Sequence, residues 1–241
     1  MRIPRFLLLA VLTAGAAPAT AERLTIDPAG SVLAILTHKA GFASGAAHDH
    51  LVTAPVTALE LDFDHANPEA TRASLVVPVD SLEIDHFAAR RRYRDRMREI
   101  GFGPAELAPV ADSDRQKVRK AMLGESQLDA AHFPEIRAEL LSFARAAEPS
   151  GEFDRLARLR ITIHGRTIER DLAARYEANV TGVLAEAWGE LLFSEFGIEP
   201  YSAVLGAVKN QDRIHLYVRL VAAPAGAGAT TVAPPPVRER R

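Results

Sequence analysis

Apolar and polar residues alternate with a period of two through most of the chain, from Leu24 to Ala222. A period of two sends successive side chains to opposite faces of a β-strand. Turn signals such as Asn67-Pro68 and His164-Gly165 separate the alternating runs. The clearest runs cover residues 59–63, 73–79, 159–163, 168–176 and 214–220. Many short antiparallel strands in one domain predict a β-sandwich or a β-barrel, and closing a barrel removes exposed strand edges.

The region from residue 86 to residue 125 breaks this pattern and changes to a helical period. Tyr93, Met97 and Ile100 fall at positions i, i+4 and i+7, and a second short apolar stripe follows them. This spacing places the apolar side chains on one side of a helix. We therefore expect an all-β domain with a short helical excursion over these residues.

Positive charge is concentrated in the same region. Residues 86–100 contain six arginines and two acidic residues, which gives a local charge of +4. The Arg90–Arg98 segment is compatible with contact to a membrane surface or an anionic head group. It is also compatible with the solvated face of a helix that lies on the barrel. The whole chain has 29 Lys and Arg against 31 Asp and Glu, which does not indicate nucleic-acid binding.

Both ends of the chain are expected to lie outside the folded domain. A basic start, a largely apolar run and the sequence Ala19-Thr20-Ala21 predict a signal peptide over residues 1–21, with an uncleaved membrane anchor as the alternative. Residues 223–241 are rich in Pro, Ala and Gly and are expected to form a disordered tail. The domain would then span residues 22–222 of a periplasmic or secreted protein, and it has no cysteine for a disulfide.

The strongest candidate chemistry lies in the sequence Ala-Ala-His-Asp-His-Leu-Val, residues 46–52. His48 and His50 would point the same way in a strand, and a neighbouring strand ending at His38 would add a third imidazole. Three histidines with an open fourth position are typical of a zinc site. A polar cluster at a barrel mouth can instead hydrogen-bond a ligand head group or nearby backbone, or have no specific role.

The remaining residues carry no catalytic signature. The motifs HExxH and GxSxG are absent, and Asp27, Asp80 and Asp85 have the positions of strand-end and turn residues. Alternation places the His215 side chain opposite that of Ile214, so we expect His215 to face solvent. These observations favour a binding protein over an enzyme.

Several short motifs follow one another in a characteristic order. They are Ile-Asp-Pro-Ala-Gly-Ser at 26–31, Leu-Asp-Ala-Ala-His-Phe-Pro-Glu-Ile at 128–136, Ile-Thr-Ile-His-Gly at 161–165, Phe-Gly-Ile at 196–198 and Asp-Arg-Ile-His-Leu at 212–216. No single motif is specific, but together and in this order they resemble the YceI-like family of exported lipid-binding proteins. The resemblance covers roughly Leu24 to Ala222. The segment after His38 and the basic insertion at residues 90–112 depart from the family pattern.

The resemblance implies an eight-stranded antiparallel barrel of lipocalin-like shape, with a cavity for a polyisoprenoid chain or a quinone tail. It implies no required cofactor, and because some members dimerise it also allows a homodimer. The ligand contacts that we expect on this basis are His38, His48, His50, Phe63, Trp188 and Phe193. The apolar residues would serve equally well as a plain packed core. A metal bound by the three histidines remains the alternative function.

Overall fold

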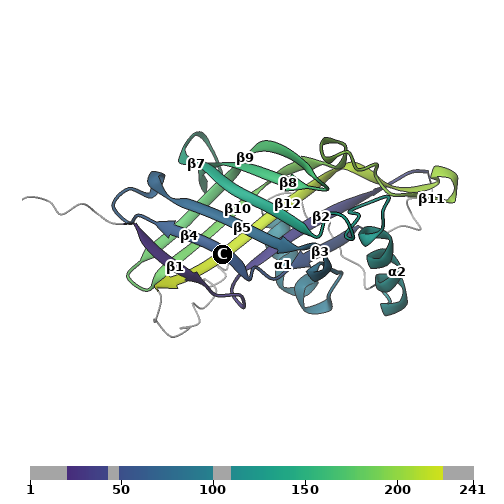
Figure 1. Cartoon of the computed structure of the whole chain (residues 1–241), viewed down its shortest axis with the longest axis horizontal. Coiled ribbons are helices and arrows are strands. Elements are labelled where there is room, and N and C mark those ends of the chain that lie inside the picture. The colour runs from purple at the N-terminus through teal and green to yellow at the C-terminus, as the bar shows by residue number, and fades with distance from the viewer. Residues whose placement is uncertain (1–20, 43–48, 100–109, 225–241) are drawn as a thin grey trace, which may run out of the picture.

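The structure is a computed structural model that describes residues 21–42, 49–99 and 110–224. The helices α1 (Phe87–Glu99) and α2 (Asp112–Leu123) both fall in the region predicted to be helical. Most of the remaining elements are strands (Figure 1). These are β1 (Glu22–Ile26), β2 (Val32–Ala40), β3 (His50–Ala54), β4 (Ala58–Phe63), β5 (Arg72–Pro78), β6 (Glu83–Ile84), β7 (Glu135–Ser150), β8 (Phe153–Ile163), β9 (Arg166–Asn179), β10 (Gly182–Leu192), β11 (Ser202–Ala203) and β12 (Val208–Pro224). The predicted signal peptide and tail lie almost entirely outside the described residues.

The described strands form one antiparallel sheet that closes on itself. Its order follows the chain from β4 through β5, β7, β8, β9 and β10 to β12. Strand β1 bonds to both β12 and β4 and thereby closes the circle. Strands β2, β3 and β6 continue β1, β4 and β5 respectively, because β2 pairs with β12 and β3, and β3 pairs with β6. With these three pairs counted as composite strands, the sheet is the predicted eight-stranded antiparallel barrel.

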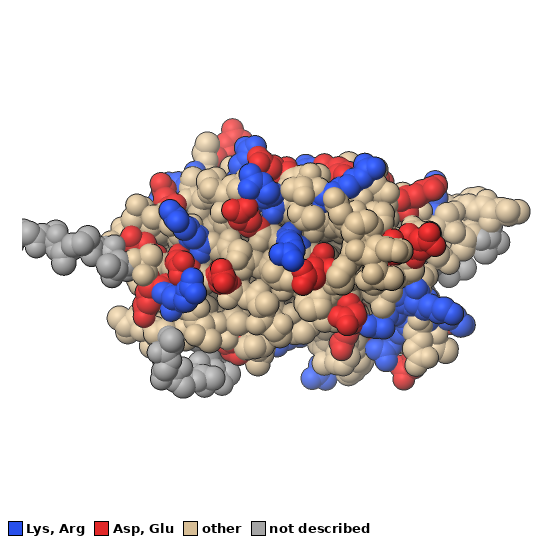
Figure 2. Space-filling model, in the orientation of Figure 1, with Lys and Arg blue, Asp and Glu red and all other residues tan. Residues whose placement is uncertain are grey.

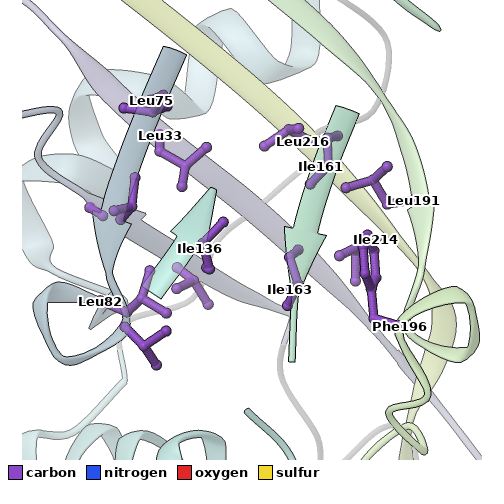
Figure 3. Packing of buried hydrophobic residues seen from close by; sticks show 14 of the residues in the cluster. Leu33, Leu75, Leu82, Ile136, Ile161, Ile163, Leu191, Phe196, Ile214 and Leu216 are labelled. Carbon is purple, nitrogen blue, oxygen red and sulfur yellow. The ribbon is translucent and has the colours of Figure 1, made fainter. Parts of the chain in front are cut away.

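Alternation along each strand divides its side chains between the barrel interior and the outer wall. In β12, Ile214 and Leu216 belong to the main buried cluster inside the barrel, whereas Tyr217 belongs to a second cluster outside it. Figure 3 shows interior side chains such as Leu33 and Ile163 projecting from different strands. Each fully buried aliphatic side chain contributes roughly 1.5–3 kcal/mol, so this interior is a main source of stability in a chain without disulfides.

Helix α1 packs against the outer wall of the barrel. Its buried residues Tyr93 and Met97 contact a cluster that includes Leu36, Leu51 and Tyr217 from the strands below. The helix therefore covers apolar side chains that alternation would otherwise leave facing water. None of the helices among the described residues is long and apolar enough to cross a bilayer.

Two buried ion pairs fix α1 to the barrel. Arg90 pairs with Asp85, which is 3% exposed, and Arg96 Nη2 lies 2.9 Å from Glu186 Oε2. Burial opposes ionisation of Glu186, but the Tyr217 hydroxyl and the guanidinium groups of Arg96 and Arg175 together lower its pKa. Breaking one buried pair typically costs about 3–5 kcal/mol, because the remaining charge stays desolvated. Two of the arginines considered for membrane contact thus point into the protein.

Closure of the barrel leaves little room where β10 begins, and this makes a testable prediction. Gly182 has a φ of +150°, and a Cβ atom there would overlap the carbonyl oxygen of Ala222 in β12. We expect Gly182→Ala to destabilise the fold by roughly 2–4 kcal/mol. The new Cβ atom would force the backbone at Ala222 to move, and alanine would also have to adopt the unfavourable positive φ at position 182. Chemical denaturation gives the free energy of unfolding.

Gly151→Ala is the matched control, because Gly151 also has a positive φ, of +60°, but has open space around its Cβ position. This variant incurs only the dihedral cost, roughly 1–2 kcal/mol. Equal losses in the two variants would show that closure against β12 imposes no extra constraint.

Candidate ligand-binding site

The barrel interior contains an apolar cavity, which we call cavity A, with a volume of about 160 Å³. Its wall is built by side chains from different strands, among them Leu33, Leu75 and Val218. Aromatic rings gather at one end, where Phe63 and Phe143 lie 5.8 and 5.7 Å from Tyr176 between ring centroids. Few polar residues border this cavity. They are Thr71, Arg175, Tyr176 and Glu186, and Arg175 pairs with Glu186.

A second cavity, cavity B, has a volume of about 200 Å³ and a more polar wall. Ile35, Ile136 and Ile163 line both cavities, so the two spaces are neighbours with these three side chains at their common boundary. Helix α2 contributes apolar residues to cavity B. The polar residues at its wall are Thr37, His50, Lys117, Gln127, Tyr201 and Asn210. The interior therefore has an apolar chamber beside a chamber with hydrogen-bonding groups.

His50 is held in the wall of cavity B by a buried carboxylate. Its Nδ1 donates to Asp85 Oδ2 at 2.7 Å, while Asp85 Oδ1 accepts the backbone N–H of Leu51 at 2.9 Å. Asp85 has a φ of +50°, a left-handed conformation that is uncommon for a residue other than glycine. Residues in such backbone conformations cluster at active sites and ligand-binding sites. The hydrogen bond fixes the ring and leaves Nε2 for a further partner.

His38 and His215 form a separate pair on the outer wall. His38 Nε2 lies 2.6 Å from His215 Nδ1, and His215 Nε2 lies 3.1 Å from Glu190 Oε1. His215 is 6% exposed, so the expectation that it faces solvent is wrong. Alternation does place its side chain outside the barrel. The imidazole of His38, from the neighbouring strand, and the Glu190 carboxylate then give it hydrogen-bonding partners there.

Burial lowers the pKa of both histidines in this pair. For His38 the positive charge of His215 lowers the pKa further, while for His215 the hydrogen bond to Glu190 raises it in part. Two imidazoles joined by one hydrogen bond cannot both be protonated on the facing nitrogens. The folded protein therefore favours the neutral forms of His38 and His215.

Comparison with known proteins agrees with this architecture. The profile of the YceI-like domain matches residues 24–222. The chain belongs to the YceI-like family. The crystal structure of Burkholderia cenocepacia BcnA shares 13% sequence identity with it and has a TM-score of 0.54, over 82% of this chain and 99% of that one. The Campylobacter jejuni YCEI protein, also 13% identical, has a TM-score of 0.47 over 69% and 80% of the two chains. No curated protein sequence is a significant match.

The YceI-like barrel separates the histidines that the sequence grouped together. His50 pairs with Thr37 across β2 and β3, so His50 faces the interior with Thr37. His38 is the next residue along β2 and faces out. The predicted common face for His38 and His50 is therefore wrong, because the strand register differs by one residue from the one it requires. His48 lies outside the described residues, among which no group of three metal-ligating side chains occurs.

The predicted aromatic contacts divide in the same way. Phe63 lines cavity A and Phe193 lines cavity B. Trp188 lies on the outer wall, where it packs near Tyr217 and Phe153, because the adjacent Ala187 takes the inward position. Trp188 and His38 thus lie outside both cavities. The sequence analysis did not identify Asn210 or the α2 residues at cavity B, since only the fold brings them to the barrel end.

The lowered histidine pKa values predict a pH dependence of stability in the YceI-like barrel. A folded-state pKa below the unfolded-state value means that the unfolded chain binds more protons as the pH falls through about 6.5. The free energy of unfolding should therefore decrease between about pH 7.5 and about pH 5.5, a range in which ordinary carboxylates stay ionised. Denaturation at several pH values measures this slope.

His215→Gln removes one titrating group of the pair and should give a shallower slope than the wild type, whatever its effect on stability at pH 7.5. His65→Gln is the control, since His65 is a largely exposed histidine near Glu22. An unchanged slope in His215→Gln would mean that the His38–His215 pair does not control acid stability.

Proposed function

We propose that this protein is an exported, non-enzymatic carrier that holds a polyisoprenoid or a similar single-chain amphiphile, such as a quinone with its tail, inside the barrel. The single observation that carries the proposal is that the apolar cavity A lies next to the more polar cavity B, with three lining residues in common. The apolar tail would occupy cavity A and end near the rings of Phe63 and Tyr176. The head group would lie in cavity B beside His50.

Accessible surface inside the barrel supports a ligand cavity over a packed core. Ala185 and Ala187 face the interior yet are only partly buried, as are Ile35 and Val218. A dry cavity costs roughly 24 cal/mol per Å³, so an empty cavity A would cost the fold about 4 kcal/mol. An apolar chain that fills this space would recover much of that free energy. Small side chains that leave such a void favour ligand binding over maximal stability.

Cavity B has the donors and acceptors that a polar head group needs. His50 Nε2 is available because Asp85 occupies Nδ1, and Asn210, Gln127 and Tyr201 supply further hydrogen-bonding groups. Buried polar groups select ligands strongly, because a ligand without the matching group leaves them unsatisfied. Hydroxyl or carbonyl oxygens of a quinone-like ring fit this set. No nucleophile with an adjacent base is needed for such a role.

The loading of cavity A can be tested with an inward-facing substitution. We expect Ala138→Phe to fill part of cavity A and to abolish binding of a polyprenyl ligand while the barrel stays folded. Native mass spectrometry beside a denaturing spectrum measures any bound mass. The wild type should lose a mass of roughly several hundred daltons on denaturation, with isoprene repeats in the extracted compound.

Ala144→Phe is the matched control, because Ala144 lies on the same strand, β7, but is exposed. It should load as the wild type does. Equal loading of the two variants, or a wild type that is free of ligand and takes up no polyprenyl quinone, would refute the proposal. A bound mass equal to one metal ion would favour the histidine–metal alternative instead.

The role of His50 gives a second test of the same site. His50→Ala should weaken binding of a short prenyl quinol, whose ring hydroxyl can donate to Nε2, roughly five- to ten-fold, the size of one lost hydrogen bond in a buried site. Affinity for a hydrocarbon of the same length should hardly change, since it makes no polar contact. Fluorescence titration of both ligands measures the difference. A parallel loss for both would assign His50 a structural role, and His38→Ala is the control on the outer wall.

A further inference from the structure

Three exposed apolar side chains gather at the end of the barrel where cavity B lies. Phe42 follows the end of β2, Leu205 lies in the turn between β11 and β12, and Tyr201 directly precedes β11. They are 91%, 107% and 42% exposed respectively. We call these three residues the apolar tip. Figure 1 shows β11 at the outermost point of this end, beyond the barrel itself.

The two turns of the apolar tip lie side by side. Strand β11 pairs with the start of β12 through Ser202 and Lys209, and Gly41 packs so closely on Ala207 that a Cβ atom would not fit. Leu205 has φ 54° and ψ 37°, a left-handed conformation that the Cβ atom of any residue other than glycine disfavours. Leu205 thus combines an unfavourable backbone conformation with a fully exposed apolar side chain. This combination indicates a contact with a partner outside the protein.

The surroundings of the apolar tip indicate a lipid partner. Tyr201 lines cavity B and is also part of the tip, so the tip lies at the mouth of that cavity. Helix α2, at the same end, carries four basic residues and two acidic ones, a net charge of +2. Asp112 and Asp114 pair with Arg115 and Lys117, while Arg119 and Lys120 supply the excess positive charge. In Figure 2 the outermost part of this end is free of charge on the visible face. Asp and Glu side chains lie beside it, and Lys and Arg side chains gather below them, where Figure 1 places α2. Apolar side chains flanked by basic ones are typical of proteins that insert into an anionic membrane interface.

We propose that the apolar tip docks on an anionic bilayer, with Phe42 and Leu205 inserted among the lipids and the basic face of α2 against their head groups. A projecting tip suits insertion between lipids better than a protein interface, which needs a broad complementary surface. The inference rests on the proposed function, because docking would place the mouth of cavity B at the membrane and let an amphiphile pass directly between them. The proposal also assigns the membrane contact to α2 and the apolar tip, and no longer to the Arg90–Arg98 segment of α1.

The chain has no cysteine, so a single engineered cysteine can report the environment of one position. Leu205→Cys and Phe42→Cys, each labelled with the polarity-sensitive dye NBD, should increase in fluorescence roughly two- to four-fold on vesicles that contain phosphatidylglycerol, as apolar surroundings replace water. Val180→Cys is the control, since Val180 is 94% exposed in the β9–β10 turn at the other end of β12. No increase at positions 42 and 205, or an equal increase at 180, would overturn the proposal.

Vesicle co-sedimentation tests the energetic contribution of the tip. The double variant Phe42→Ser with Leu205→Asn should bind phosphatidylglycerol vesicles roughly ten-fold more weakly, whereas Val180→Asn should bind normally. Asparagine tolerates the left-handed backbone at position 205, and exposed positions should leave the melting temperature unchanged. Binding that is lost in Lys117→Gln with Lys120→Gln but retained in the tip variant would overturn insertion in favour of simple charge attraction.

The two proposals fail in distinguishable ways. The Ala138→Phe variant, with NBD at position 205, should still dock on vesicles although it takes up no polyprenyl ligand. Docking without any ligand uptake by the wild type would refute the carrier function and leave the membrane contact. Ligand uptake without docking, or chemical crosslinking of the tip to a protein in place of lipid, would refute the membrane contact and leave the carrier.

Discussion

The interior of the barrel depends on the hydrogen bonds that β12 makes along both of its edges. On one edge β12 pairs with β10 from Arg213 to Ala222, and on the other edge it pairs with both β2 and β1. The pairing of β12 with β1 joins the two ends of the sheet, so these two strands together turn an open sheet into a barrel. An open sheet of these strands would expose the apolar face that now surrounds cavities A and B. Closure thus creates the edge-free fold and the ligand space together.

The register of β12 also decides which side chains are buried on the outer wall of the barrel and which face the two cavities. Its even-numbered residues from Ile214 to Leu220 line the interior, while His215, Tyr217 and Arg219 face the outer wall. Outside, Glu186 gathers Arg96, Arg175 and Tyr217, which compensates the cost of burying its charge under α1. The arrangement keeps these charges paired with one another. Cavity A can therefore stay apolar even though its wall is backed by ion pairs.

The sequence predicted the strands, the helical excursion and the barrel, because each depends on periods that are local in the chain. The histidine assignments depended on register, which alternation within a single strand cannot set. Because His50 lies opposite Thr37, His38 faces the outer wall and not the interior. There the His38 imidazole from β2 contacts His215 and helps to bury it. Asp85 looked like a turn residue and has a turn conformation, yet its carboxylate is shared by His50 and Arg90. Such long-range pairs have no signature in the spacing of neighbouring residues.

Most of the polar groups that reach the interior do so at the end of the barrel where β2, β3 and β12 are irregular. Strand β3 begins at His50, the β2–β12 ladder shifts register between Asn210 and Ile214, and α2 crosses the opening with Lys117. In a regular strand each inward position must fit an apolar wall, but a strand start, a bulge or a helix can turn a polar side chain inward. The same irregular end carries the strained Leu205 and the exposed Phe42. A head-group site needs polar side chains in the interior, and a membrane contact needs apolar side chains outside it. Both depart from regular alternation, and both occur at this end of the barrel.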